Sequence, residues 1–164
     1  MSERLFVAVW PPDEVLDAID ALPRPELSGV RWTDRRQWHA TLRFLGDADE
    51  GDVRSALDTV EAPAVEAHLG PGMQRLGRGV LCVPVSGLDA VAAAVIEATR
   101  SIGRPPDHRK FRGHLTLARV NGRVPRLSAA IDRRWTVATF DLVRSHLGGG
   151  PARYETVATW RLQP

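Results

Sequence analysis

The chain has 164 residues, of which 43% are hydrophobic and 26% charged, with a formal net charge of only +2. This composition is typical of one compact globular domain and argues against global disorder. No apolar run is long enough to span a membrane, and the first residues lack the features of a signal peptide. A single cysteine, Cys82, cannot form an internal disulfide, so we expect a reducing, cytoplasmic setting.

Strand-like and helix-like segments alternate in the first half of the chain. Runs rich in β-branched and apolar residues predict four strands, over residues 5–10, 39–45, 65–69 and 80–85. Apolar residues that recur on one helical face predict two helices, over residues 13–22 and 51–60. We expect Asp13 to cap the first of these helices.

The second half of the chain repeats this plan. Its residues predict helices over 89–102 and 126–131, and strands over 114–120, 136–147 and 153–162. No change of composition marks a linker, so we expect one domain over residues 1–164. Strands in both halves, with helices between them, favour an α+β fold of two similar lobes.

Basic residues are concentrated in one part of the second half. Eight lie close together against a single acid, Asp107: Arg100, Arg104, Arg109, Lys110, Arg112, Arg119, Arg123 and Arg126. Such an excess favours an anionic partner, and phosphate is the usual one. A solvated basic surface without a ligand fits the same pattern.

Two tetrapeptides stand out, His39-Ala40-Thr41-Leu42 and His114-Leu115-Thr116-Leu117. Each lies in a segment that predicts a β-strand, where side chains alternate between the two faces. The histidine and threonine of each copy therefore share one face, and the leucine at the fourth position lies on the other. The chance that two of the five histidines carry this pattern is roughly a few in ten thousand. We therefore interpret the doubled motif as functional.

The doubled motif suits the in-line opening of a cyclic phosphate. One imidazole can take the proton from water while the other protonates the departing ribose oxygen, because histidine adopts both protonation states near neutral pH. The two threonine hydroxyls can hydrogen-bond the phosphoryl oxygens and hold phosphorus between the imidazoles. A zinc site would need at least three protein ligands, which neither motif supplies. We expect no metal and no cofactor.

The sequence resembles the 2H phosphoesterase superfamily and, within it, the bacterial and archaeal RNA 2′,3′-cyclic phosphodiesterases, historically called 2′-5′ RNA ligases. Four segments carry the resemblance: RLFVAV at 4–9, WHATLRFLG at 38–46, FRGHLTLAR at 111–119, and SHL at 145–147 with Tyr154. The chain departs from the family at Gly113, where proline is common. The resemblance implies a bilobal α+β fold with two pseudo-symmetric, mostly antiparallel sheets, outer helices and a central cleft that holds both motifs.

The same resemblance implies roles for the motif residues. His39 would be the general acid toward the leaving oxygen and His114 the general base on water, so that the product is a 2′-phosphate. Taken alone, the residues treat the two histidines symmetrically and leave this assignment open. Thr41 and Thr116 would bind the phosphate. Reversible 2′-5′ RNA ligation is implied as a side reaction.

Arginines near the motifs offer further contacts. Arg119 follows the second motif and could contact the phosphate or ribose, although regular strand alternation places it opposite His114. Arg43 shares a face with His39 and Thr41 and could also reach the cleft, although we expect it to be solvated. Cys82 lies in an apolar run and is expected to be a buried small hydrophobe.

Two classes of function remain open on these residues. The first is a metal-independent cyclic phosphodiesterase that acts on RNA termini or on small nucleotide or ADP-ribose cyclic phosphates. The second is a non-catalytic module that binds RNA ends. The paired histidines favour the enzyme, because binding alone needs no acid and base. We expect a monomer with no membrane partner.

Overall fold

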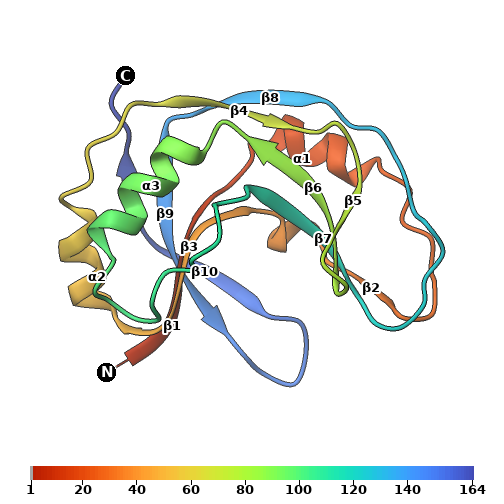
Figure 1. The fold of residues 1–164 in the computed structure, drawn as a ribbon, viewed down its shortest axis with the longest axis horizontal. Coiled ribbons are helices and arrows are strands. Elements are labelled where there is room, and N and C mark those ends of the chain that lie inside the picture. Colours follow the sequence, from red (N-terminus) through yellow and green to blue (C-terminus); the bar gives the residue numbers. More distant parts are fainter. Residues whose placement is uncertain (1) are drawn as a thin grey trace.

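A computed structural model describes residues 2–164 of the chain, drawn in Figure 1. Three α-helices, one short 3₁₀ helix and ten strands follow one another in this order: β1 (Ser2–Val9), α1 (Asp13–Asp20), β2 (Val30–Trp32), the 3₁₀ helix (Arg35–Gln37), β3 (Ala40–Asp49), α2 (Glu50–Leu57), β4 (Val65–Leu69), β5 (Gln74–Leu76), β6 (Val80–Ser86), α3 (Asp89–Ala98), β7 (His114–Val120), β8 (Arg133–Val137), β9 (Thr139–His146) and β10 (Arg153–Arg161).

The strands form a curled, antiparallel sheet in the order β10-β9-β1-β3-β7-β6-β4-β8, with β2 added to β7 and β5 to β6. Its two halves join between β3 and β7, where one residue pair, Ala40 with Leu115, is hydrogen-bonded in register. The halves are the two lobes of the fold. The predicted α+β, mostly antiparallel, bilobal architecture is confirmed, and the two strands that carry the motifs lie at the junction.

Each lobe is covered by a helix that follows a strand of the other lobe in the sequence. The helix α1 follows β1 but contacts β8, and α3 follows β6 but contacts β3 (Figure 1). The main apolar core lies between these helices and the sheet, and it receives Leu5 and Val7 from β1 and Leu115 from β7. This exchange of helices ties the lobes together behind the junction.

Both motif strands contain a β-bulge at the leucine of the motif. Val7 and Ala8 pair with Arg43 and Thr41, which leaves Leu42 as an extra residue in β3. In β7, Leu117 is the extra residue opposite β6. A bulge adds one residue to a strand and so reverses the alternation of side chains beyond it. Arg43 and Phe44 in β3, and the residues after Leu117 in β7, therefore face the opposite side from that predicted for a regular strand. A second extra residue in β3, Leu45, restores the original alternation beyond it.

Two predicted elements differ in the structure. The helix expected over residues 126–131 is wrong, because the backbone there bonds to another segment: Met73 donates to Ala129 O at 2.9 Å and Ile131 to Pro71 O at 2.9 Å. The strand expected over 136–147 is two strands that separate at Ala138, of which β8 pairs with β4 and β9 with β1. No glycine or proline within residues 136–147 marks this break in the sequence.

Candidate active site

The five predicted site residues line one cavity of about 480 Å³ between the lobes, which we call the central cleft: His39, Thr41, His114, Thr116 and Arg119. The pairing of Ala40 with Leu115 explains this convergence. In an antiparallel register, it places His39 beside Thr116 and Thr41 beside His114, with the two histidines on a diagonal. Each imidazole therefore has a hydroxyl on its own strand and another across the junction.

His39 is held by two hydrogen bonds and an aromatic surround. Its Nδ1 lies 2.7 Å from the carbonyl oxygen of Gln37, and its Nε2 lies 2.9 Å from Oγ1 of Thr41. A carbonyl can only accept, so Nδ1 carries a proton, and in the neutral ring Nε2 accepts from the Thr41 hydroxyl. The rings of Phe6, Trp10 and Tyr154 lie 4.9, 5.2 and 5.2 Å from the imidazole centroid.

The aromatic surround changes the acidity of His39. Burial lowers the pKa of His39 to about 4; the hydrogen bond to Gln37 opposes this shift, and the nearby charges of His114 and Arg119 add to it. In the free protein the ring is therefore neutral at pH 7. A bound phosphate would bring a negative charge beside it and raise this pKa, because an opposite charge favours the protonated form.

We expect an NMR titration to find the pKa of His39 near 4 in the free protein and clearly higher with a nucleoside 2′-phosphate bound. Unfolded chains bind the histidine proton near pH 6.5, so unfolding takes up a proton between pH 6.5 and 4. The unfolding free energy should therefore fall by up to about 3 kcal/mol as the pH is lowered through this window. His39→Gln should remove that part of the decline. A free-protein pKa near 6.5 would contradict the effect of burial.

His114 begins β7 and is oriented in the same way as His39. Its Nδ1 lies 2.8 Å from the carbonyl oxygen of Arg112, again two residues earlier in the chain. The residue between them, Gly113, packs so closely that an added Cβ would lie 2.2 Å from the carbonyl oxygen of Val85. The glycine that departs from the family pattern is thus required by close contact with β6. Within residues 2–164, Nε2 of His114 has no hydrogen-bond partner and is available to a ligand in the cleft.

Thr33, which the sequence did not single out, connects the two motifs. Its hydroxyl oxygen lies 3.0 and 2.9 Å from the carbonyl oxygens of Thr116 and Leu117, and it accepts a hydrogen bond of 3.0 Å from the indole N–H of Trp38. Trp38 directly precedes His39, and Leu117 is the bulged residue of β7. One hydroxyl thus links the start of the first motif to the bulge of the second.

Thr33→Val should lower the unfolding free energy by about 1–2 kcal/mol, because the buried indole N–H of Trp38 loses its acceptor. Denaturant unfolding measures this loss. Thr33→Ser keeps the hydroxyl and should stay close to the wild type. Equal stability of the valine and serine variants would show that the link through Thr33 does not matter.

The central cleft is strongly cationic. Arg4, Arg31 and Arg119 line it, and no carboxylate of the described residues does. Arg31 of β2 pairs directly with Arg119 of β7, an arrangement of like charges that is unfavourable unless an anion lies between or near them. The sequence did not indicate Arg31, because β2 has only three residues and its partner strand is distant in the chain.

Arg119 and Arg43 both differ from the alternation expected for regular strands. The bulge at Leu117 turns Arg119 into the cleft beside His114 and Thr116. The bulge at Leu42 turns Arg43 away from the cleft, where it is only 5% exposed. Arg43 was expected to be solvated, and this was wrong. Its guanidinium instead donates to carbonyl oxygens of Phe44, Thr99, Ile102 and Arg104 at 2.7–3.3 Å.

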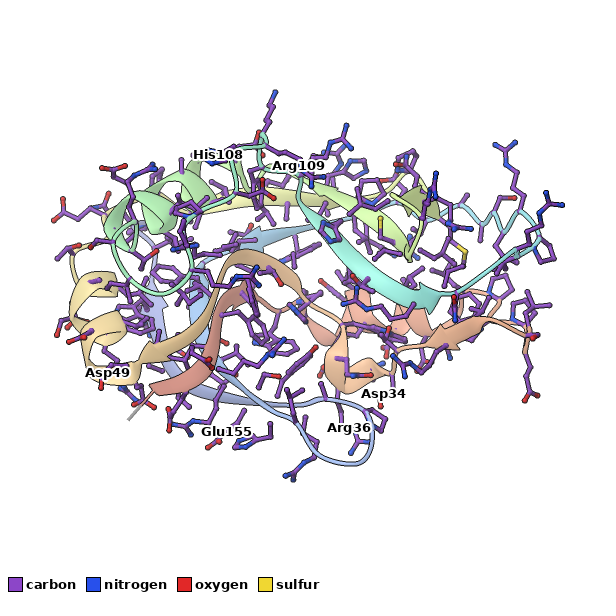
Figure 2. All side chains as sticks on the ribbon, turned by 60° about the horizontal axis from the view of Figure 1, so that its bottom comes forward. Asp34, Arg36, Asp49, His108, Arg109 and Glu155 are labelled. Carbon is purple, nitrogen blue, oxygen red and sulfur yellow. The ribbon has the colours of Figure 1, made fainter. Side chains whose placement is uncertain are left out.

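The remaining histidines and the cysteine lie outside the cleft. His68 pairs with Asp132 at 2.6 Å and His146 with Glu155 at 2.8 Å, both near the surface. Figure 2 shows His108 on the exposed loop between α3 and β7. Cys82 is buried, as predicted.

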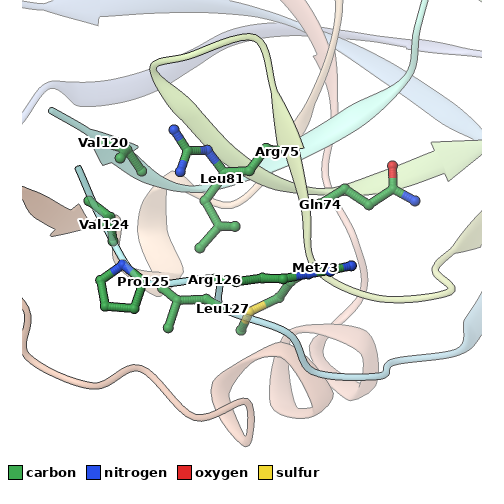
Figure 3. A pocket seen from close by; sticks show the side chains of 9 residues that line it. All are labelled: Met73, Gln74, Arg75, Leu81, Val120, Val124, Pro125, Arg126 and Leu127. Atoms are coloured by element: carbon green, nitrogen blue, oxygen red, sulfur yellow. The ribbon is translucent and has the colours of Figure 1, made fainter. Parts of the chain in front are cut away.

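A separate cavity of about 300 Å³ lies on the lobe of β5, β6 and β7 (Figure 3). Its lining is mainly apolar, with Met73, Leu81 and Leu127, and its charged groups are Arg75 and Arg126. No histidine, cysteine or carboxylate of the described residues lines it, so it offers no acid, base or nucleophile. Across residues 2–164, no three potential metal-ligating side chains cluster, and no helix has the length and apolarity to cross a membrane.

Comparisons with known proteins agree with this fold. The family model described as LigT like Phosphoesterase matches residues 9–69, which include the first motif. The RNA 2′,3′-cyclic phosphodiesterase of Geobacillus stearothermophilus is 28% identical over 178 positions, covering 96% of this chain and 56% of that protein. The chain thus spans little more than half the length of this curated relative.

Solved structures extend the likeness to the whole chain. The protein TT0787 of Thermus thermophilus superposes with a TM-score of 0.82 at 26% identity, covering 98% of both chains. E. coli LigT in complex with 3′-AMP superposes with a TM-score of 0.82 at 24% identity, covering 100% of both chains. The likeness therefore includes the second motif strand and both lobes.

Proposed function

We propose, on the premise that this chain is a LigT-like 2H phosphoesterase, that it hydrolyses 2′,3′-cyclic phosphates at RNA ends to 2′-phosphomonoesters. One observation carries the proposal. Two His-x-Thr pairs from adjacent strands converge on a single cleft that contains three arginines and, among the described residues, no carboxylate. This arrangement supplies an acid, a base and an anion site together.

The cleft supplies groups for both sides of an in-line displacement. A cyclic phosphate held by the Thr41 and Thr116 hydroxyls and by Arg119 would have an imidazole on either side, because the histidines lie on a diagonal. One Nε2 takes a proton from the attacking water, and the other gives a proton to the departing 3′ oxygen of the ribose. The P–O3′ bond breaks as the new P–O bond forms, and the phosphate remains on O2′.

The family resemblance assigns the acid to His39 and the base to His114. Since burial lowers the pKa of His39 to about 4 in the free protein, its acid form is produced when the anionic substrate binds and raises that pKa. Substrate binding and activation of the acid are then a single event. His114 keeps its Nε2 toward the cleft through the bond of its Nδ1 to Arg112 O.

Known relatives support the proposed substrate class. The relative from Geobacillus stearothermophilus is named an RNA 2′,3′-cyclic phosphodiesterase, and E. coli LigT forms a complex with 3′-AMP. A nucleotide in the central cleft would lie beside the ring of Phe44, which the bulge at Leu42 turns to this side. Aromatic rings of this kind stack on unpaired bases.

The test is hydrolysis of a short RNA that ends in a 2′,3′-cyclic phosphate, in the presence of EDTA, with the position of the product phosphate mapped. We expect turnover without added metal and a 2′-phosphate as the product. Absence of turnover on RNA ends and on small cyclic nucleotides, together with binding of RNA ends, would favour the non-catalytic module. A 3′-phosphate product would contradict the assigned leaving oxygen.

A further inference from the structure

A second cavity, of about 910 Å³, adjoins the central cleft, and we call it the basic groove. It lies between β3, α3 and the loop of residues 104–112. Thr41, Phe44 and His114 line both the groove and the cleft. A ligand held in the cleft between the histidines can therefore continue into the groove without leaving the protein surface.

The loop that forms the groove is fixed at both of its ends. At its start, Arg104 N donates to Leu45 O at 2.8 Å, and Arg104 O accepts from Arg43 at 2.7 Å. At its end, Val85 N donates to Gly113 O at 2.9 Å, and Arg112 O binds His114. The groove wall is thus anchored to β3 and to the motif residue itself, as a permanent binding surface would be.

The groove is lined by cations whose charges are poorly balanced by acids. Arg104, Arg109, Lys110 and Arg112 are all exposed, and the one acid present, Asp107, lies 3.8 Å from Arg109. Among residues 2–164, no ion pair involves Arg104, Lys110 or Arg112. Figure 2 shows Arg109 on the outer part of this loop. Four cations beside one carboxylate repel one another, and a polyanion in the groove would relieve that repulsion.

The fold separates this loop from the other arginines of the basic stretch in the sequence. Arg119 faces the central cleft, whereas Arg126 lines the distant cavity of Figure 3. Arg123 and Arg126 lie on the irregular segment after β7. Within the basic stretch, the exposed positive charge that lines the groove therefore comes from the 104–112 loop. Arg123 and Arg126 carry the same charge outside the groove and serve as a comparison.

From these observations we propose that the basic groove binds the phosphodiester backbone of the nucleotides on the 5′ side of the cyclic phosphate. The inference rests on the proposed function and adds the surface that holds the RNA chain attached to the terminal nucleotide. The only chain attached to a terminal cyclic phosphate nucleotide leaves through its 5′ oxygen, and the groove is a cationic cavity that shares Thr41, Phe44 and His114 with the cleft. Backbone contacts of this kind give affinity without base sequence preference.

The test compares kcat/KM for a ten-nucleotide RNA ending in a 2′,3′-cyclic phosphate with kcat/KM for a nucleoside 2′,3′-cyclic monophosphate. Arg109→Gln/Lys110→Gln should reduce the value for RNA about tenfold, through KM, and leave the mononucleotide within about twofold. For RNA, the slope of log(kcat/KM) against the logarithm of the salt concentration should become less negative by about 1. The control Arg123→Gln/Arg126→Gln removes the same charge and should change neither substrate appreciably.

Three results would overturn the groove proposal. The wild type could have equal kcat/KM for both substrates, Arg109→Gln/Lys110→Gln could leave kcat/KM for RNA unchanged, or it could reduce that value no more than Arg123→Gln/Arg126→Gln does. If the wild type hydrolyses neither substrate, the proposed function fails, and the groove is judged by binding alone. Fluorescence anisotropy of a 5′-labelled RNA with a terminal 2′-phosphate then measures Kd for the same variants. Weaker binding only in Arg109→Gln/Lys110→Gln supports the groove, and unchanged binding refutes it.

Discussion

His39→Ala and His114→Ala should each reduce kcat/KM on an RNA 2′,3′-cyclic phosphate by about 10²–10⁴-fold, which is the usual contribution of a general acid or base. Each imidazole is held in place through its Nδ1 by a backbone carbonyl two residues earlier. Nε2 of His39 lies against the Thr41 hydroxyl, and Nε2 of His114 faces the cleft. Because acid and base act in one displacement, the double variant should be little worse than the poorer single variant. Initial rates over a range of substrate concentrations measure these losses.

Matched controls come from histidines outside the cleft. His68→Ala removes a histidine that pairs with Asp132 and lines neither the cleft nor the groove, and it should keep the activity within about twofold. Thermal unfolding of each variant separates loss of chemistry from loss of fold. Full activity in either His39→Ala or His114→Ala, with the other variant inactive, would mean that a single histidine or water performs both proton transfers and would contradict the paired mechanism.

Arg43→Met should lower the unfolding free energy by about 2–4 kcal/mol, although Arg43 was expected from sequence to lie in solvent. Its buried guanidinium supplies hydrogen bonds to four carbonyl oxygens and to Oγ1 of Thr99, all near the end of α3. Methionine fills much of the volume but leaves those acceptors unpaired, which costs more than the hydrogen bonds alone contribute. A cation at the C-terminal end of α3 also offsets the helix dipole. Urea unfolding measures the change.

Two further variants show whether the buried hydrogen bonds of Arg43, rather than its charge alone, stabilise the fold. Arg43→Lys should recover only part of the stability, because one ammonium group cannot reach acceptors that a planar guanidinium spans. Arg100→Met removes a surface arginine that pairs with Glu97 and should cost less than about 1 kcal/mol. Similar losses in Arg43→Met and Arg100→Met would show that the buried network contributes no more than an exposed ion pair.

Much of the secondary structure and the main site residues follow from the sequence. The strands 114–120 and 65–69 were predicted at their observed bounds, and α3 begins at Asp89 as expected. These segments have strong local patterns, because a buried strand or an amphipathic helix has apolar residues at regular intervals along the chain. The two motifs can be predicted for a related reason, since each is defined by residue type and spacing within four positions.

Features that depend on pairing between distant strands were not predictable in this way. The residues 136–147 contain no glycine or proline that would mark the break at Ala138, which arises because β8 pairs with β4 and β9 with β1. The predicted helix over 126–131 failed for the same reason, as residues 71–73 compete for its backbone hydrogen bonds. Local propensity is weak compared with such tertiary contacts.

The sequence alone thus predicted the α+β class and singled out two histidines and two threonines that the fold brings to one cleft, and both depend on residue identity and short-range spacing. Only the tertiary structure decided the positions of Arg43 and Arg119, the link through Thr33 and the pairing of Arg31 with Arg119. The physical reason is the register between strands. An extra residue at Leu42 reverses the faces of Arg43 and Phe44, and another at Leu117 reverses the face of Arg119. These bulges depend on pairing with a distant strand, which the neighbouring residues do not indicate.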